Sequence, residues 1–291
     1  MNSAGKPWIL GFLLGASLSF RQVKRKPSYR PLLPLFKYFG GKSRVARKIV
    51  SYIPANKTWV EPFAGGASVT LAKPPSEKEV LADKRADVVR FFRKVKAGEP
   101  IKDLKPDVSK HEFDIIRSKP ENRRSPAEFL ALQQKSFGGH GQSFARGSAI
   151  IRKQLERYDD YWQRLRKTII LNSDFRKTMR KYDSPSTVFY LDPPYPNPRD
   201  KFVDYGGHGI PSVQDVRTAI DMAKGKVMLS YPNTPEVRRA FPKSKFHIKK
   251  FRLYRPLTSY NAGPRTRSEL LILNYRPSTR NRWHLLEGVA G

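Results

Sequence analysis

The sequence predicts an α/β protein built on a doubly wound, mostly parallel sheet of seven strands. Three observations lead to this fold class. Most strand candidates are short, continuous apolar runs, which is typical of parallel strands that are buried on both faces. Helical patterns lie between them, and strands that alternate with helices favour a doubly wound sheet. One long polar and basic segment interrupts the alternation, and we expect it to be an insertion.

The expected strands, in chain order, are Thr58–Glu61, Val80–Asp83, Thr168–Leu171, Val188–Leu191, Lys226–Ser230, Lys245–Leu253 and Glu269–Tyr275. The segment Lys245–Leu253 alternates imperfectly between apolar and polar residues, which indicates an antiparallel pair late in the chain. We expect Ser43 to cap a helix with apolar residues at four-residue spacing. A second amphipathic helix is expected at Ala86–Val95.

The interrupting segment spans residues 98–165 and has a mostly helical period. Its centre, Ser136–Gly147, contains four glycines and two aromatic residues, which predicts a flexible loop outside the core. The expected organisation has four parts. These are an N-terminal extension outside the fold (1–31), a catalytic domain in two pieces (32–97 and 166–276), the insertion (98–165) and a C-terminal tail (277–291).

The charge balance of the chain is unusual. Its 291 residues include 57 Lys and Arg against 25 Asp and Glu, a formal net charge of +32. Residues 1–60 contain no acid, and residues 237–268 contain ten Lys and Arg and no acid. Such a balance implies a polyanionic partner, most simply nucleic acid.

Composition also excludes several kinds of site. The chain has no cysteine, which excludes disulfides, thiolate zinc sites and cysteine nucleophiles. The five histidines are scattered, so we expect no metal. The apolar segment Pro7–Phe20 is too short to span a bilayer comfortably, and we interpret it as part of the extension, with no membrane partner.

A proline-rich turn follows the strand at Val188–Leu191. Asp192-Pro193-Pro194-Tyr195 is stiff there because two prolines fix φ and remove two backbone donors. The Asp192 carboxylate and the Pro193 carbonyl can accept from the exocyclic NH2 of a nucleobase, and the ring of Tyr195 can stack on the base. This arrangement suits methylation of a nucleobase amino group.

Two earlier segments suggest a nucleotide-like ligand. Trp59–Val69 runs from an apolar strand through a small-residue turn into a helix, which brings backbone close to such a ligand. Asp83 ends the next strand, 18 residues after Gly65, near the spacing at which an acid meets ribose hydroxyls. Before both lies Lys37–Lys42, a glycine turn with cations and an aromatic residue.

The ordered set Lys-Tyr-Phe-Gly-Gly-Lys, Glu-Pro-Phe-Ala-Gly-Gly, Ala-Asp and Asp-Pro-Pro-Tyr resembles the Dam-type (D12 class) DNA adenine N6-methyltransferases. Asn172–Phe175 and Ser268–Tyr275 extend the resemblance to roughly residues 35–276. It implies a Rossmann-like class I methyltransferase fold with an inserted, mostly helical target-recognition domain. The family often has Phe-Asn-Gly in that domain, whereas this chain has Phe137-Gly138-Gly139, so the recognised sequence is not implied.

The activity implied by the resemblance is site-specific transfer of methyl from S-adenosylmethionine to N6 of a flipped adenine in double-stranded DNA, as in restriction-modification. The implied catalytic residues are Asp192, Pro193, Pro194 and Tyr195. The implied donor-binding residues are Tyr38, Lys42, Glu61, Phe63, Ala64, Gly65, Asp83, Asp174, Phe175 and Asp192. The expected DNA contacts are Lys135, Arg146, Arg252, Arg255, Arg265 and Arg267.

Other interpretations stay open at this point. An RNA adenine or DNA cytosine-N4 methyltransferase would share most motifs, although cytosine-N4 enzymes more often carry Ser where Asp192 stands. A catalytically inactive, basic nucleic-acid-binding protein would be expected to lack one of the donor contacts, and this chain has them all. We expect a monomer in the cytoplasm of a bacterial or phage-infected cell.

Overall fold

The computed structural model describes residues 29–101, 108–139, 141–145, 156–194, 209–254 and 266–278. Contacts divide the chain into two units, Met1–Arg30 and Pro31–Gly291, and every element below belongs to the second. The apolar segment Pro7–Phe20 lies outside the described residues. Among the helices that are described, none has the length and the apolar run needed to cross a membrane.

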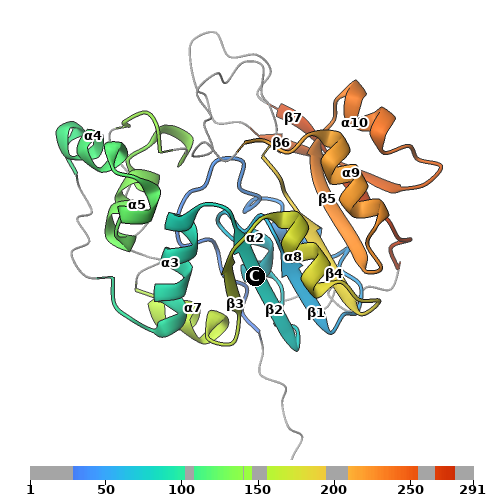
Figure 1. Cartoon of the computed structure of the whole chain (residues 1–291), viewed down its shortest axis with the longest axis horizontal. Helices are drawn as coiled ribbons and strands as arrows, with labels where there is room; N and C mark the ends of the chain where they lie inside the picture. The colour runs from blue at the N-terminus through green and yellow to red at the C-terminus, as the bar shows by residue number, and fades with distance from the viewer. Residues whose placement is uncertain are drawn as a thin grey trace, which may run out of the picture. The chain divides into compact units, whose positions relative to one another are not determined.

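The described residues form a seven-stranded sheet in the order β3-β2-β1-β4-β5-β7-β6 (Figure 1). The strands are β1 (Thr58–Glu61), β2 (Lys78–Asp83), β3 (Ile169–Asn172), β4 (Thr187–Leu191), β5 (Lys226–Pro232), β6 (His247–Tyr254) and β7 (Thr266–Leu273). The first five are parallel, and β7 pairs antiparallel with both β5 and β6. The predicted mostly parallel sheet and its late antiparallel pair are therefore confirmed.

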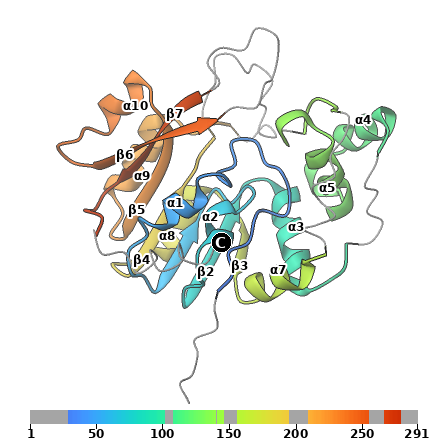
Figure 2. The ribbon, with the colours of Figure 1, turned by 180° about the vertical axis from the view of Figure 1, so that it is seen from behind.

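Helices pack on both faces of the sheet, and the side chains of strand β4 show why. Its side chains alternate, so Val188 and Tyr190 share one hydrophobic cluster while Phe189 and Leu191 share another. The first cluster contains helices α1 (Ala46–Val50) and α2 (Ser68–Ala72). The second contains α8 (Phe175–Tyr182), α9 (Val213–Asp221) and α10 (Pro235–Ala240). Figures 1 and 2 show α8 and α9 on one face and α1 and α2 on the other.

Several predicted boundaries were wrong. The last strand runs from Thr266 to Leu273 and not from Glu269 to Tyr275, and β2 begins two residues before the predicted Val80. The first helix begins at Ala46 with Val45 at its N-cap, and no side chain caps it, so Ser43 does not have the predicted role. Strand β6 begins at His247, because the backbone N–H groups of Lys245 and Phe246 both donate to the Pro242 carbonyl in a turn. The amphipathic helix predicted at Ala86–Val95 is confirmed as α3 (Ala86–Ala97), which ends at Gly98 with φ 73°.

The segment between α3 and β3 contains α4 (Lys110–Ser118), η1 (Glu121–Arg123), α5 (Pro126–Gln134), η2 (Phe137–Gly139) and α7 (Tyr158–Leu165). Helices α4 and α5 each begin with a capping box, Ser109 with Glu112 and Ser125 with Glu128, which satisfies backbone donors of the first turn. Helices α5 and α7 both pack on α3, and α4 packs on α5. The structure thus contains helices in the region where the sequence has a helical period.

The glycine-rich loop after α5 is tied to its surroundings where it is described. Ser136 forms an isolated β-bridge with Phe144, whose ring packs edge-on against Phe113 at 5.5 Å between centroids. Gly139 has φ 76°, and a Cβ there would lie 2.8 Å from the Lys37 carbonyl oxygen. The loop therefore makes specific contacts, and glycine is required where it meets the backbone at Lys37.

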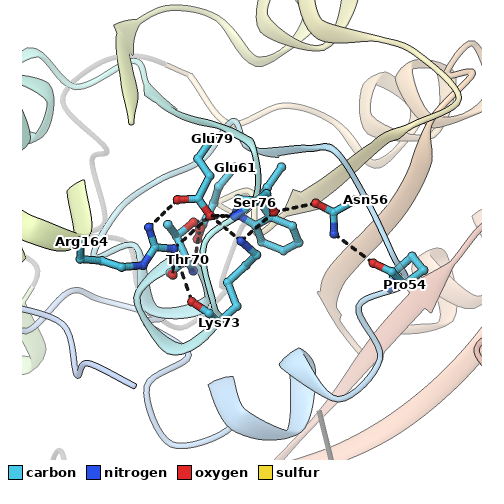
Figure 3. A network of polar contacts seen from close by, with 9 residues as sticks. Pro54, Asn56, Glu61, Thr70, Lys73, Ser76, Glu79 and Arg164 are labelled. Atoms are coloured by element: carbon cyan, nitrogen blue, oxygen red, sulfur yellow. Dashed lines mark hydrogen bonds and ion pairs between the residues drawn. The ribbon is translucent and has the colours of Figure 1, made fainter. Parts of the chain in front are cut away.

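A buried polar network joins α2, β2 and α7 (Figure 3). The Glu79 carboxylate accepts from Lys73 and from both terminal nitrogens of Arg164, and it also accepts from the Ser76 backbone N–H at 3.1 Å. Arg164 donates further to the Thr70 carbonyl at 2.6 Å. Burial acts to raise the pKa of Glu79, but the two cations outweigh it and lower the pKa below its usual value. One carboxylate thus pairs with two cations away from water.

Glu61, at the end of β1, is buried beside this network. Thr70 donates to its carboxyl group from both its hydroxyl and its backbone N–H, and the Thr70 hydroxyl accepts from the Trp59 indole at 2.7 Å. Burial raises the pKa of Glu61 to about 8, and the Thr70 hydrogen bonds only partly offset this. Glu61 is therefore mostly protonated at neutral pH.

The first prediction concerns the buried network. Glu79→Gln leaves Lys73 and Arg164 buried without a counter-charge, so it should lower the free energy of unfolding by about 3–5 kcal/mol. Urea denaturation followed by tryptophan fluorescence measures this. The matched control is Glu99→Gln, which removes a carboxylate that is 61 % exposed and paired with Lys94, and should change stability by less than about 1 kcal/mol. Equal losses in both variants would contradict the prediction.

The second prediction concerns pH. The folded chain keeps the Glu61 proton up to about pH 8, whereas the unfolded chain releases it near the ordinary glutamate value of 4.5. The unfolded state therefore binds fewer protons between these values, and stability should fall as pH rises through this window. Glu61→Gln removes this titration, so its stability relative to the parent should increase from pH 5 to pH 8, by about 1.4 kcal/mol per unit of pKa difference at most. A difference that stays constant with pH would contradict the assignment.

Candidate active site

A cavity of about 310 Å³ opens where the parallel strands end. It lies beside the point where the strand order reverses, because the chain passes from β1 to β2 on one side and β4 pairs with β1 on the other. Its walls are formed by 38–42, 61–69, 83–85, 173–176, Tyr190, 192–194, 209–211 and Asp215. An acid stands at or just after the end of each of the first four parallel strands: Glu61, Asp83, Asp174 and Asp192.

The glycine pair of the first motif shapes one wall. The Gly41 N–H donates to the Tyr38 carbonyl at 2.9 Å, and Gly40 has φ 74° in the turn that this bond closes. A Cβ on Gly65 would lie 2.9 Å from the Tyr38 ring, so the ring packs directly on that glycine. The turn places the next residue, Lys42, at the inner end of the cavity.

Lys42 contacts the first residue of the Asp-Pro-Pro-Tyr motif. Its ammonium donates to both carboxylate oxygens of Asp192, at 2.7 and 2.9 Å, and to the Gly40 carbonyl at 2.8 Å. A second carboxylate, Glu269 in β7, lies 3.5 Å from the same nitrogen. Two residues 150 positions apart in the chain thus form a charged pair at the cavity.

Asp83 holds the turn after β1 against the end of β2. One carboxylate oxygen accepts from the Gly65 N–H and the other from the Arg85 N–H, both at 2.9 Å. The Ala64 N–H donates to the Ala82 carbonyl beside them. Burial raises the pKa of Asp83 above its usual value, although both backbone hydrogen bonds act against this. Each carboxylate oxygen keeps a second lone pair, which can accept from a ligand hydroxyl.

The opposite wall combines an ionised acid with two aromatic rings. Asp174 caps α8 by accepting from the Arg176 N–H at 2.9 Å, and it pairs with the side chains of Arg176 and Lys84. Partial burial acts to raise its pKa, but the hydrogen bonds from Arg176 and Lys84 hold the pKa at about 2. The rings of Phe63 and Phe175 lie 4.9 Å apart between centroids, beside this carboxylate.

The expected donor-binding residues Tyr38, Lys42, Glu61, Phe63, Ala64, Gly65, Asp83, Asp174, Phe175 and Asp192 all line the one cavity, together with Pro193 and Pro194. Tyr195, Arg146, Arg255 and Arg265 lie outside the described residues, as does the side chain of Arg267. Arg252 is exposed on β6, whereas Lys135 is only 6 % exposed. An ammonium buried to that extent does not face a DNA backbone, so the prediction for Lys135 does not fit its position.

The sequence analysis did not predict several residues of the cavity. Arg85 and Tyr190 line the cavity, and Glu269 contacts Lys42 from β7. A signal for Glu269 existed, because a glutamate next to an apolar run such as Leu270–Leu273 must be paired when that strand is buried. Within the residues that the structure describes, no group of three or more acids and histidines is placed to bind a metal ion.

Comparison with known proteins identifies the family. Residues 38–254 match the D12 class N6 adenine-specific DNA methyltransferase family. The chain is 27 % identical to the type II methyltransferase M.CviBI of Paramecium bursaria Chlorella virus NC1A, over 72 % of this chain and 86 % of that protein. It is 26 % identical to the DNA adenine methylase of Haemophilus influenzae, over 85 % and 96 %.

Among solved structures, the tRNA m1G37 methyltransferase of M. jannaschii matches 81 % of this chain and 50 % of its own chain, at 11 % identity and a TM-score of 0.37. That score is too low to carry an argument, and the family match does not depend on it. The match over residues 38–254 spans both the motifs that line the cavity and the insertion between them. This chain belongs to the D12 class of N6 adenine-specific DNA methyltransferases.

Proposed function

We propose that the cavity binds S-adenosylmethionine through residues on three neighbouring strand ends. Asp83 accepts from the ribose hydroxyls with its remaining lone pairs. Asp174 accepts from the adenine amine of the donor, and Phe63 and Phe175 pack against its ring. The side chains at these strand ends support this proposal, because they supply acceptor oxygens for hydroxyl and amine groups and aromatic faces for a base ring. Bound there, the donor supplies an electrophilic methyl group.

We assign Glu61 and Tyr38 to the part of the cavity that holds the methionine group of the donor. Tyr38 packs on Gly65 and on the guanidinium of Arg85, 5.9 Å from the ring centroid, so its position is well determined. Glu61 is mostly protonated without a ligand. A ligand ammonium close by would favour its ionised form, so donor binding would release a proton from Glu61.

The target adenine takes the remaining part of the site. Its amine donates to the Asp192 carboxylate and to the Pro193 carbonyl, which hold N6 in line with the methyl group and stabilise the positive charge that develops on nitrogen. Pro194 stiffens the turn, and Tyr195 stacks on the flipped base. Asp192 follows β4 directly and lies in the same cavity as the donor residues, which is the observation that carries this assignment.

The insertion and the basic segments complete the proposal. Residues 98–165 read the target sequence in double-stranded DNA, and the run 237–268 follows its backbone. Exposed Lys249, Lys250 and Arg252 on β6 support the second role, since this strand leads into the 255–265 segment. One chain carries the residues proposed for both the donor and the target base, so a monomer is the simplest form of this proposal. Its DNA substrate suits action in the cytoplasm of a bacterial or phage-infected cell.

The decisive experiment incubates the protein with labelled S-adenosylmethionine and unmethylated duplex DNA, followed by nucleoside analysis and mapping of the modified positions. N6-methyladenine at a defined sequence is the expected product. N4-methylcytosine, or label in RNA alone, would overturn the assignment of the target. A protein that binds DNA without any transfer would favour the inactive alternative.

The third prediction separates catalysis from binding at Asp192. Asp192→Ala removes the acceptor of the target amine, and single-turnover methyl transfer should fall by roughly 10²–10³, as when a preorganised electrostatic group is lost. DNA affinity, measured by fluorescence anisotropy, should change little because phosphate contacts dominate it. Near-normal turnover in a folded variant would show that the motif is only a structural turn.

The fourth prediction isolates the donor contact of Asp174 from its capping role. Asparagine is as good an N-cap as aspartate, so Asp174→Asn should keep α8 intact. Its amide nitrogen, however, replaces one acceptor oxygen and cannot accept from the donor adenine. The affinity for S-adenosylhomocysteine, measured by calorimetry, should weaken about tenfold. Unchanged affinity at unchanged melting temperature would exclude the contact.

A further inference from the structure

Lys42 lies between two carboxylates from different strands. Its nitrogen is 2.7 and 2.9 Å from the oxygens of Asp192, which follows β4, and 3.5 Å from Oε2 of Glu269 in β7. In the sheet, β5 separates these two strands. The side chains of Lys42 and Glu269 are 2 % and 4 % exposed, so the interaction is shielded from solvent. One ammonium therefore faces two acids.

The position of Glu269 makes this contact unusual. It pairs in register with Phe251 and Pro232, and it is followed by the buried run Leu270–Leu273. Burying a carboxylate in such surroundings is costly unless a cation or several donors compensate it. Lys42 also contacts Asp192, so the two acids share one ammonium.

The proposed function creates a conflict at Asp192. The target amine can use the second lone pair of an Asp192 oxygen, but both oxygens already contact the Lys42 ammonium, which compensates the carboxylate charge. A compensated carboxylate stabilises the positive charge on the reacting nitrogen less, so transfer favours a Lys42 ammonium that shifts away from Asp192. A buried ammonium that loses its counter-charge would be strongly destabilised, so it needs a second acid within reach.

We propose that Glu269 is a positioning residue that acts through Lys42 and, on the basis of the function proposed above, frees Asp192 for the target amine. A charge-assisted hydrogen bond is about 2.7–2.9 Å long, so a shift of Nζ by somewhat less than about 1 Å brings Lys42 into full contact with Glu269. Lys42 then pairs with Glu269, and the carboxylate of Asp192 interacts with the amine of the target base.

The charge count supports the same role. The methyl donor brings a sulfonium, and positive charge develops on the target nitrogen during transfer. When Lys42 pairs with Glu269, the negative charge of Asp192 remains available to the reacting atoms. Without Glu269, Lys42 and the reacting atoms compete for Asp192. The loss is therefore expected in kcat more than in binding.

The test begins with Glu269→Gln, which keeps the shape of the side chain and removes its charge. We expect kcat to fall at least tenfold, while the affinities for S-adenosylhomocysteine and DNA change less than about threefold. Glu269→Asp keeps the charge and should retain part of the rate. The charge-matched control is Glu236→Gln, an exposed acid at the start of α10, which should leave kcat unchanged.

A double-mutant cycle with Lys42→Met distinguishes positioning from a merely structural role. If Glu269 acts through Lys42, Glu269→Gln should change kcat little in the Lys42→Met background, because the residue through which it acts is already absent. The same fold loss of kcat in both backgrounds would overturn the proposal. So would wild-type kcat in Glu269→Gln.

Two further outcomes are distinguishable. If the parent protein forms no N6-methyladenine, the proposed function fails, whereas normal methylation by both the parent and Glu269→Gln overturns only this inference. If Glu269→Gln does not fold, as judged by its melting curve and S-adenosylhomocysteine binding, Glu269→Asp replaces it. Equal kcat in Glu269→Asp and the parent would then overturn the proposal, because the shorter side chain cannot hold Lys42 at the same place.

Discussion

The whole site depends on the pairing of β1 with β2 on one side and β4 on the other. Parallel strands end at the same edge of a sheet, so this pairing brings Glu61, Asp83 and Asp192 to one edge. The reversal of strand order between β1 and β4 leaves space above that edge, because the connections leave in opposite directions. Local backbone features then orient each functional side chain, such as the glycine turn before Lys42 and the proline pair after Asp192.

Charge is handled differently in the two buried clusters around this edge. In the network of Lys73, Glu79 and Arg164, one acid pairs with two cations and links α7 to α2 and β2. At Lys42 the arrangement is reversed, since one ammonium contacts both Asp192 and Glu269. In the proposed function, these acids stabilise the positive charge that develops on the target nitrogen.

The remaining positive charge lies mostly outside these clusters and has a simpler role. A net charge of +32 attracts DNA without regard to sequence. Sequence choice requires contacts that only a shaped surface can make, and we propose this role for the insertion, whose helices α5 and α7 pack on α3. The capping boxes of α4 and α5 define where these two helices of the insertion begin.

The sequence by itself determined the order of strands and helices, because apolar runs and helical periods are local properties of the chain. It also determined most of the cavity residues, since each family motif is a contiguous segment. It misplaced the start of the first helix at Ser43, because a turn that the Val45 N–H closes on the Lys42 carbonyl comes before the helix, which begins at Ala46. Only the tertiary structure decided that Lys42 meets Asp192 and Glu269, and that Lys135 is buried. These contacts join residues far apart in the chain, and their geometry follows from strand order and register, which no local pattern encodes.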